Sequence, residues 1–247
     1  MRGLAKLVRD RTARRDEQRL VIDGPRALST FLDAGGVVEA VFVDAAERVP
    51  SPLPDDVAVH LVERRELDRI ADSSTPQGLL AVGRFVPVSL DHVATNATKV
   101  VVLDGVQDPG NVGAVVRVAA AAGVDALIAA KGTADVSSPR AVRASAGTIA
   151  MLDVVVGVSA AEAVEVLQTA GVTTVATAMD GEPMSTPISA DRVAWVFGAE
   201  GPGVSAEVLA AVDHRVAVPM AAPVESLNVA VTAGIVLYAA AQPGPTA

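Results

Sequence analysis

The chain alternates short apolar runs with helical stretches from Lys99 onward, and this alternation restricts its fold more than any other feature. The apolar runs are Val100–Leu103, Ala126–Ala130, Val154–Val156, Thr173–Ala178, Ala194–Phe197 and Val216–Val218. The helical stretches are Asn111–Ala122, Pro139–Ala146, Ala160–Ala170, Ser205–Ala211 and Ser226–Ala241. Strands that alternate with helices in this way form a mostly parallel sheet covered by helices. The sequence therefore predicts an α/β domain over residues 99–247.

Residues 1–88 predict a second, smaller α/β domain. Helical patterns cover residues 4–19, 25–34 and Arg64–Ile70. Strand-like runs lie at Val21-Ile22, Ala40–Val43, Val57–Val62 and Leu79–Phe85. Residues 89–98 separate the two patterns and are expected to form a linker.

The composition agrees with this fold class and excludes several kinds of site. Hydrophobic residues make up 51% of the chain and aromatic residues only 2%, so Ala, Val and Leu must build the core, as buried parallel strands require. The absence of cysteine excludes disulfides, thiolate catalysis and the usual zinc knuckles. No apolar stretch approaches the roughly 20 residues that cross a bilayer, and the Arg-rich start lacks an apolar signal core. We expect a soluble cytoplasmic protein with neither a metal nor a membrane partner.

The charge is distributed unevenly along the chain. The net charge is −9, which by itself argues against a nucleic-acid partner. Residues 1–30, however, carry eight Lys and Arg against four Asp and Glu. This basic start is either a surface that contacts phosphates or a solvated first helix, and composition favours neither interpretation.

Three segments near expected strand ends are rich in Gly, Pro and small polar residues. Ligands of α/β sheets bind where the carboxyl ends of strands meet helix amino termini. The first segment, Leu103–Arg117, places Asn111 at a helix start and Arg117 two turns into that helix. Its glycine spacing does not match the dinucleotide fingerprint, and the chain has no phosphate-binding loop with its lysine. These absences argue against a nucleotide-dependent oxidoreductase or an NTPase.

The second segment surrounds one carboxylate, that of Glu200, with three glycines over Val196–Ser205. Bare backbone amides there could bind the polar edge of an adenine or ribose, although a simple turn is the alternative. In the third segment, Val218–Val231, Ser226 is placed to cap the last helix. Asn228 would then lie in the first turn of an apolar helix and needs a partner if it is buried.

Together and in this order, the three segments resemble the signature motifs of the SpoU-type (TrmH-like) branch of the SPOUT RNA methyltransferases. The resemblance covers residues 99–241. The segments Leu20–Leu28 and Thr75–Val82 resemble that family's accessory domain, an α/β module related to RNA-binding ribosomal proteins. The resemblance implies a deep trefoil knot in the carboxy-terminal domain, a homodimer and S-adenosyl-L-methionine as cofactor. It also implies methylation of a ribose 2′-hydroxyl in RNA, with rRNA, specifically 23S rRNA, expected before tRNA.

The resemblance assigns roles to residues of this chain. The expected catalytic residues are Asn111, Arg117, Glu200, Ser226 and Asn228. The expected cofactor-binding residues are Thr177, Ala178, Met179, Gly198, Gly203, Val218, Met220 and Leu227. The candidates for RNA binding are Arg9, Arg11, Arg14, Arg26, Gln77, Arg140 and Arg143. For the last two arginines, salt bridges on the helix surface are an equally good interpretation.

The role of Arg117 has two versions. In one it acts as the base, assisted by a substrate phosphate. In the other it clamps that phosphate and stabilises the developing alkoxide, which suits a guanidinium better because this group stays protonated in proteins. Two alternative functions also stay open, a tRNA 2′-O-methyltransferase and a catalytically silent RNA-binding protein on the same fold.

Overall fold

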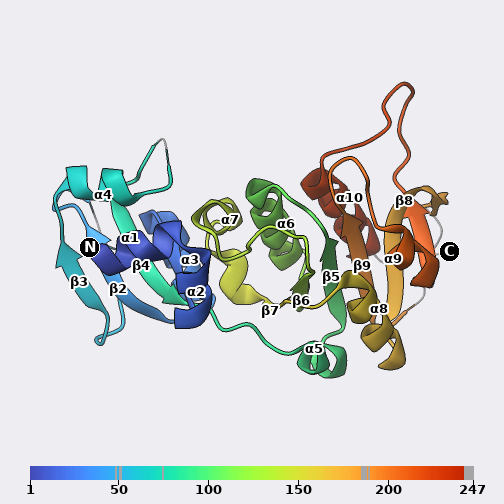
Figure 1. Cartoon of the computed structure of the whole chain (residues 1–247), viewed down its shortest axis with the longest axis horizontal. Helices are drawn as coiled ribbons and strands as arrows, with labels where there is room; N and C mark the ends of the chain where they lie inside the picture. The colour runs from blue at the N-terminus through green and yellow to red at the C-terminus, as the bar shows by residue number, and fades with distance from the viewer. Residues whose placement is uncertain (48, 50–51, 74, 185–187, 189, 242–247) are drawn as a thin grey trace. The chain divides into compact units, whose positions relative to one another are not determined.

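A computed structural model describes the chain except for residues 48, 50–51, 74, 185–187, 189 and 242–247. The chain divides into two compact units (Figure 1). The first contains Met1–Val86 and Asp135–Met151, and the second contains Pro87–Ala134 and Leu152–Ala247. The insertion 135–151, which the sequence pattern placed in the larger domain, thus packs with the first unit. A Cβ atom on Gly147 would lie 2.2 Å from the carbonyl oxygen of Ala27, so this packing requires a glycine.

The first unit is built on a four-stranded sheet with the order β1-β4-β2-β3. Its strands are β1 (Arg19–Asp23), β2 (Val38–Val43), β3 (Ala58–Leu61) and β4 (Leu79–Arg84). β4 runs antiparallel to β1 and β2, whereas β2 and β3 are parallel. The helices are α1 (Arg2–Arg9), α2 (Arg11–Glu17), α3 (Pro25–Asp33), α4 (Arg64–Ile70), α7 (Pro139–Ser145) and the 3-10 helix η1 (Thr148–Met151). Apolar residues of α1, α2 and α4 pack on β1 and β4 to form one buried core cluster of this unit.

The single helix expected over residues 4–19 is wrong. Asp10 has an extended backbone, with φ −116° and ψ 110°, and ends α1. Its side chain accepts hydrogen bonds from the amides of Thr12 and Ala13, so the same residue caps α2. The chain therefore turns at Asp10, and Leu4, Leu7 and Ala13 all reach the core.

The second unit contains a six-stranded sheet with the order β10-β8-β9-β5-β6-β7. All five strand pairs are parallel, which confirms the predicted fold class. The strands are β5 (Lys99–Asp104), β6 (Ala126–Ala129), β7 (Asp153–Val156), β8 (Thr173–Pro183), β9 (Val193–Gly198) and β10 (His214–Ala217). β5 and β9 are almost continuously buried apolar strands, as parallel sheets require. The trefoil knot stays a prediction.

Helices cover both faces of this sheet (Figure 1). They are α5 (Leu90–Asn96), α6 (Pro109–Ala121), α8 (Ala160–Thr169), α9 (Ala206–Ala211) and α10 (Val229–Ala241). α6 and α10 pack against each other on one face, and residues of α5, α8 and α9 share a core on the other.

The expected linker, residues 89–98, contains a packed helix. Ser89 caps α5 by accepting a hydrogen bond from the amide of His92. Leu90, Val93 and Ala94 are buried in the core of the second unit. This segment is therefore part of the larger fold rather than a free connection. Among the described residues, no helix is long and apolar enough to cross a membrane.

Candidate active site

The three loops singled out in the sequence follow strands of the second unit. They come after β5, β9 and β10, which together with β8 are four adjacent strands of the six-stranded sheet. Because the strands are parallel, their carboxyl ends meet at one edge, and loops that follow neighbouring strands lie close together. The structure thus brings the three segments together, as expected for a ligand site.

The loop after β9 is held closed by backbone bonds. Ala199 and Gly203 exchange two hydrogen bonds, with N–O distances of 3.1 and 3.0 Å. A Cβ atom on Gly198 would lie 2.0 Å from both the carbonyl carbon of Gly203 and the nitrogen of Val204. Gly201 and Gly203 have φ values of +96° and +73°, which favour glycine. The glycines are therefore required by this tight loop, and Glu200 projects from its middle.

Glu200 connects the loop after β9 to the loop and helix after β5. Its Oε1 accepts a hydrogen bond from Nδ2 of Asn111 at 2.7 Å, and its Oε2 accepts one from the backbone amide of Gln107 at 3.1 Å. Desolvation by itself would raise the pKa of Glu200. The hydrogen bonds from Asn111 and from backbone amides outweigh that effect and lower the pKa, so the group is a carboxylate at neutral pH.

Asn228 extends this connection to the third loop. Its Nδ2 donates to Oδ1 of Asn111 at 2.9 Å, while its Oδ1 accepts from the amides of Ala230 and Val231 at 2.9 and 3.4 Å. The expectation that Ser226 caps the last helix is therefore wrong, since Asn228 caps α10. Its cap bonds use Oδ1 and leave Nδ2 for Asn111. A chain of side chains, Glu200–Asn111–Asn228, thus joins all three loops.

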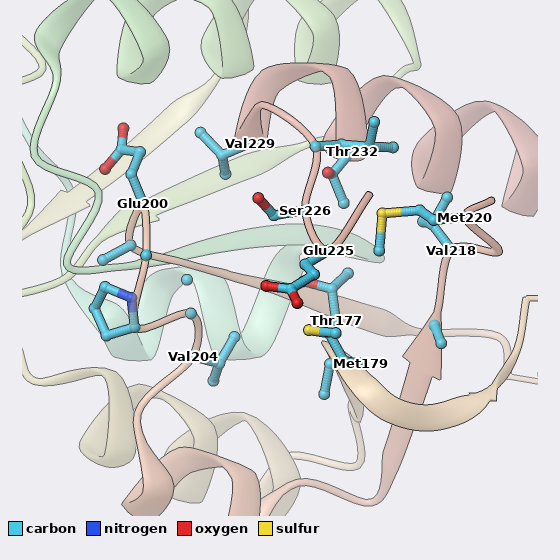
Figure 2. A pocket seen from close by; sticks show the side chains of 18 of the residues that line it. Thr177, Met179, Glu200, Val204, Val218, Met220, Glu225, Ser226, Val229 and Thr232 are labelled. Atoms are coloured by element: carbon cyan, nitrogen blue, oxygen red, sulfur yellow. The ribbon is translucent and has the colours of Figure 1, made fainter. Parts of the chain in front are cut away.

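A cavity of about 820 Å³ opens beside Glu200 and Asn228. Figure 2 shows Glu200 among the side chains that line it. The volume of the cavity lies within the range of small-molecule sites. All eight residues expected to bind the cofactor line it, namely Thr177, Ala178, Met179, Gly198, Gly203, Val218, Met220 and Leu227. Glu200, Ser226 and Asn228 line it as well, so the cavity and the chain of side chains share a wall.

Two of the expected catalytic residues are not bonded to the others. Arg117 is exposed on α6, does not line the cavity, and its side chain makes no hydrogen bond or ion pair with the residues that the structure describes. Ser226 lines the cavity, yet its side chain likewise has no bonded partner in the described part of the chain. Asn111, Glu200 and Asn228 are therefore the three that the structure brings together.

Three residues that position the site were missed in the sequence. The carboxylate of Asp104 accepts from the amide of Ser205 at 2.8 Å, which adds a second tie between the loops after β5 and β9. The buried hydroxyl of Thr133 donates to the carbonyl of Leu103 at 2.8 Å and accepts from the amide of Gly105 at 3.1 Å. Gln107 acts through its backbone amide, and such a role cannot be predicted from the type of residue. A polar residue that directly ends an apolar strand, such as Asp104, is the one available sequence signal.

The RNA-binding candidates all lie in the first unit, in different environments. Arg14 is buried and donates to the carbonyls of Leu7 and Val8 and, at 2.6 Å, to Asp135, so it is not accessible to RNA in this structure. Arg143 donates to the carbonyl of Asp72 and lies 3.5 Å from Asp23. The exposed candidates are Arg9, which donates to the carbonyl of Arg69, together with Arg11, Arg26, Gln77 and Arg140.

Within the described residues, no group of three or more Asp, Glu or His side chains is arranged to bind a metal ion.

Comparison with known proteins identifies the family. The model of the SpoU rRNA Methylase family matches residues 98–238. The chain belongs to this family. The model of the MRM3-like substrate binding domain matches residues 2–81. Family membership confirms the predicted methyltransferase class and S-adenosylmethionine as the methyl donor.

Known proteins with similar sequences and structures match nearly the whole chain. The 23S rRNA (guanosine(2553)-2′-O)-methyltransferase RlmP of Bacillus subtilis is 32% identical over 219 residues, covering 88% of this chain and 86% of the relative. A solved RNA 2′-O ribose methyltransferase has a TM-score of 0.81 and 30% identity, covering 97% of this chain and 93% of its own. AviRb of Streptomyces viridochromogenes, a SpoU methyltransferase solved with AdoMet, has a TM-score of 0.84 and 25% identity, covering 97% and 96%.

The site of this SpoU protein fits S-adenosylmethionine. The cavity has the size of a small-molecule pocket, and its glycine-rich wall at Gly198 and Gly203 exposes backbone groups to a ligand. Its described lining includes the carboxylates of Asp180, Glu200 and Glu225 but no Lys, Arg or His. A donor with a positively charged sulfonium is therefore electrostatically compatible with this cavity.

Proposed function

We propose that this enzyme transfers the methyl group of S-adenosylmethionine to a ribose 2′-hydroxyl of 23S rRNA. The observation that carries the proposal is the wall shared by the cavity and the bonded residues Glu200, Asn111 and Asn228. A methyl donor in the cavity would have ordered polar side chains beside it. Such an arrangement suits an in-line transfer, in which the alignment of donor and acceptor supplies much of the rate.

S-adenosylmethionine, when bound, supplies an electrophilic methyl group. Thr177 of β8, Gly198 at the end of β9, and the loop that contains Val218 and Leu227 would bind and orient it. Asn111 has a fixed orientation because its amide oxygen accepts from Asn228 and its amide nitrogen donates to Glu200. Its second N–H remains available to position a ribose oxygen.

Arg117 is the group in this proposal that meets the substrate's negative charge. It lies six positions after Asn111 on α6, which is about 9 Å along the helix axis. Its guanidinium stays protonated, so it would clamp a phosphate and stabilise the alkoxide that develops as the 2′-hydroxyl loses its proton. The freedom of its side chain from bonds within the described chain supports a role toward a ligand.

Ribosomal RNA is the proposed substrate because of the first unit and the nature of the relatives. Residues 2–81 match a substrate-binding domain, and the relative RlmP is named as a 23S rRNA methyltransferase. A cytoplasmic location follows from this substrate. A tRNA substrate is the alternative within the same enzyme class, and a silent RNA-binding protein is the alternative outside it.

The test is methyl transfer from labelled S-adenosylmethionine to protein-free 23S rRNA, with bulk tRNA in parallel. We expect incorporation into rRNA that protects one position from alkaline cleavage, because a methylated 2′-oxygen no longer attacks the adjacent phosphate. Labelling of tRNA alone would contradict the rRNA proposal, and binding of RNA without any methyl transfer would favour the silent protein.

Arg11 and Arg26 carry the prediction for RNA binding, because both are exposed and neither side chain has a partner among the described residues. Replacing both with alanine should weaken rRNA binding and reduce the slope of log K against log salt by about 0.7–0.9 for each lost phosphate contact. Filter binding at several salt concentrations measures this slope. Arg15→Ala is the control, since Arg15 already pairs with Asp16 at 2.9 Å. An unchanged slope in the double variant would exclude these arginines from the RNA surface.

We also propose that the enzyme is a homodimer that forms through α10. Val231, Ile235 and Tyr238 are 51%, 40% and 51% exposed, and their spacing places them along one side of this helix. A continuous exposed apolar stripe indicates an interface, and a two-fold dimer would bury the same stripe on both subunits. α10 also contributes Val229 and Thr232 to the cavity, so the interface would adjoin the site.

The predicted effect of Ile235→Asp is a monomer in sedimentation velocity runs at micromolar concentration, because a symmetric interface would bury two copies of the new charge, one from each subunit. The control is Leu61→Asp on β3, where a leucine that is 74% exposed is changed in the same way. A dimer that survives Ile235→Asp, or a wild type that is already monomeric, would contradict this interface.

A further inference from the structure

Three carboxylates line the cavity, and two of them have protein partners among the described residues. Glu200 accepts hydrogen bonds from Asn111 and Gln107. Asp180 forms an ion pair with Arg215, and 3.1 Å separates its Oδ2 from Nη1 of Arg215. Glu225 makes no hydrogen bond or ion pair with the residues that the structure describes, and its carboxylate lies among Thr177, Met179 and Ser226 in the cavity (Figure 2). Among the described residues, Glu225 is therefore the lining carboxylate that has no protein partner and stays available to a ligand.

A lone carboxylate acts differently on the two forms of the methyl donor. S-adenosylmethionine contains a sulfonium with a full positive charge, whereas the product S-adenosylhomocysteine contains a neutral thioether. The adenosine, the amino group and the carboxylate are the same in both, so hydrogen bonds to those parts cannot distinguish them. A charge near the sulfur separates donor from product, because its Coulomb attraction to the sulfonium disappears with the methyl group.

We infer that Glu225 is a specificity-determining residue that favours the charged methyl donor over its neutral product. This inference rests on the proposed function, because it assumes that the cavity binds S-adenosylmethionine. No Lys, Arg or His lines the described cavity to cancel the charge of Glu225. For charges about 4 Å apart in a water-like medium, the attraction corresponds to about a fivefold difference in affinity. The same preference would release the product after each transfer.

The electrostatic origin has a second consequence. Glu225 is exposed to solvent, so dissolved salt should screen its effect. The affinity ratio of donor to product should therefore shrink as ionic strength rises. A hydrogen bond from the ribose of the ligand to Glu225 would instead strengthen the binding of donor and product to a similar extent.

Calorimetric titration of the full chain with S-adenosylmethionine, S-adenosylhomocysteine and sinefungin tests the inference. Sinefungin has a protonated amine in place of the sulfonium. Glu225→Gln should weaken the binding of the two ligands with the extra positive charge about fivefold and leave the affinity for S-adenosylhomocysteine within about twofold of the wild type. The control Glu207→Gln removes the same charge from α9, outside the cavity lining, and should leave the ratio unchanged.

The possible results separate this inference from the function on which it rests. If Glu225→Gln weakens the binding of all three ligands equally, or leaves the affinity ratio of donor to product unchanged, the selective role of Glu225 is overturned while the cofactor site survives. Failure of all three ligands to bind the wild-type chain would instead overturn the proposed function. The inference is supported if Glu225→Gln loses the preference for donor over product and if the wild-type affinity ratio of donor to product falls with added salt.

Discussion

Arg117→Ala is expected to lower kcat for methyl transfer to 23S rRNA at least about a hundredfold, as removal of one charge-stabilising group does in other active sites. The affinity for S-adenosylmethionine should stay within about twofold, because Arg117 does not line the cavity. The melting temperature should also be preserved, since the side chain is exposed and unbonded among the described residues. Single-turnover assays with saturating rRNA, together with calorimetry for the cofactor, measure the two quantities separately.

Two further variants identify what Arg117 contributes. Arg117→Lys retains the charge but loses the planar fork that binds a phosphate through two parallel bonds, so it should recover only part of the rate. Lys99→Ala removes one positive charge at the amino end of β5, the opposite end from the site loops, and should leave kcat unchanged. If Arg117→Ala keeps its rate within about tenfold, Arg117 is not at the reacting centre.

The fold could be predicted where the burial of a strand requires a recognisable run of apolar residues in the sequence. Buried parallel strands such as Val100–Leu103 and Ala194–Phe197 are apolar on both faces, so their runs are visible. The break at Asp10 was missed because one polar residue between two helical patterns could equally lie on a solvated helix face. The helix within residues 89–98 has only two turns, and its existence depends on burial of Leu90 and Val93.

The site could be predicted where a motif places a residue at a strand end. The cofactor-binding candidates from Thr177 to Leu227 line one cavity because β8 and the loops after β9 and β10 meet at one edge of the sheet. Contacts that side chains make across that edge could not be predicted from the amino-acid sequence. Nothing in the sequence shows that Asn228 serves both as a helix cap and as a partner of Asn111.

Arg14 shows the same limit in the first unit. Its charge and position made it an RNA-binding candidate, yet it is only 5% exposed. The carbonyls at the end of α1 and the carboxylate of Asp135 surround its guanidinium, and Asp135 lies 121 residues away in the sequence. A buried arginine is tolerated where such partners replace its hydration, and that environment is a property of the folded unit rather than of a local pattern.

Gly198→Ala is expected to abolish measurable binding of S-adenosylmethionine. The added methyl group would lie 2.0 Å from the carbonyl carbon of Gly203 and 2.3 Å from its oxygen, so the obstacle is backbone that cannot rotate away. The loop after β9 would have to open, which breaks its two bonds between Ala199 and Gly203 and displaces Glu200. Overpacking of this kind costs about 1–3 kcal/mol of stability, so the chain should still fold at room temperature.

Gly234→Ala is the matched control, because it makes the same chemical change in the same unit. Its new methyl group would lie 3.8 Å from the side chain of Val118, an ordinary contact. Alanine inside α10 should stabilise the helix by up to about 1 kcal/mol, and cofactor binding should be unchanged. Thermal melts and calorimetry on both variants would thus separate a steric effect in the loop from a general effect of glycine replacement. If Gly198→Ala binds S-adenosylmethionine as the wild type does, the loop after β9 is not a wall of the cofactor site.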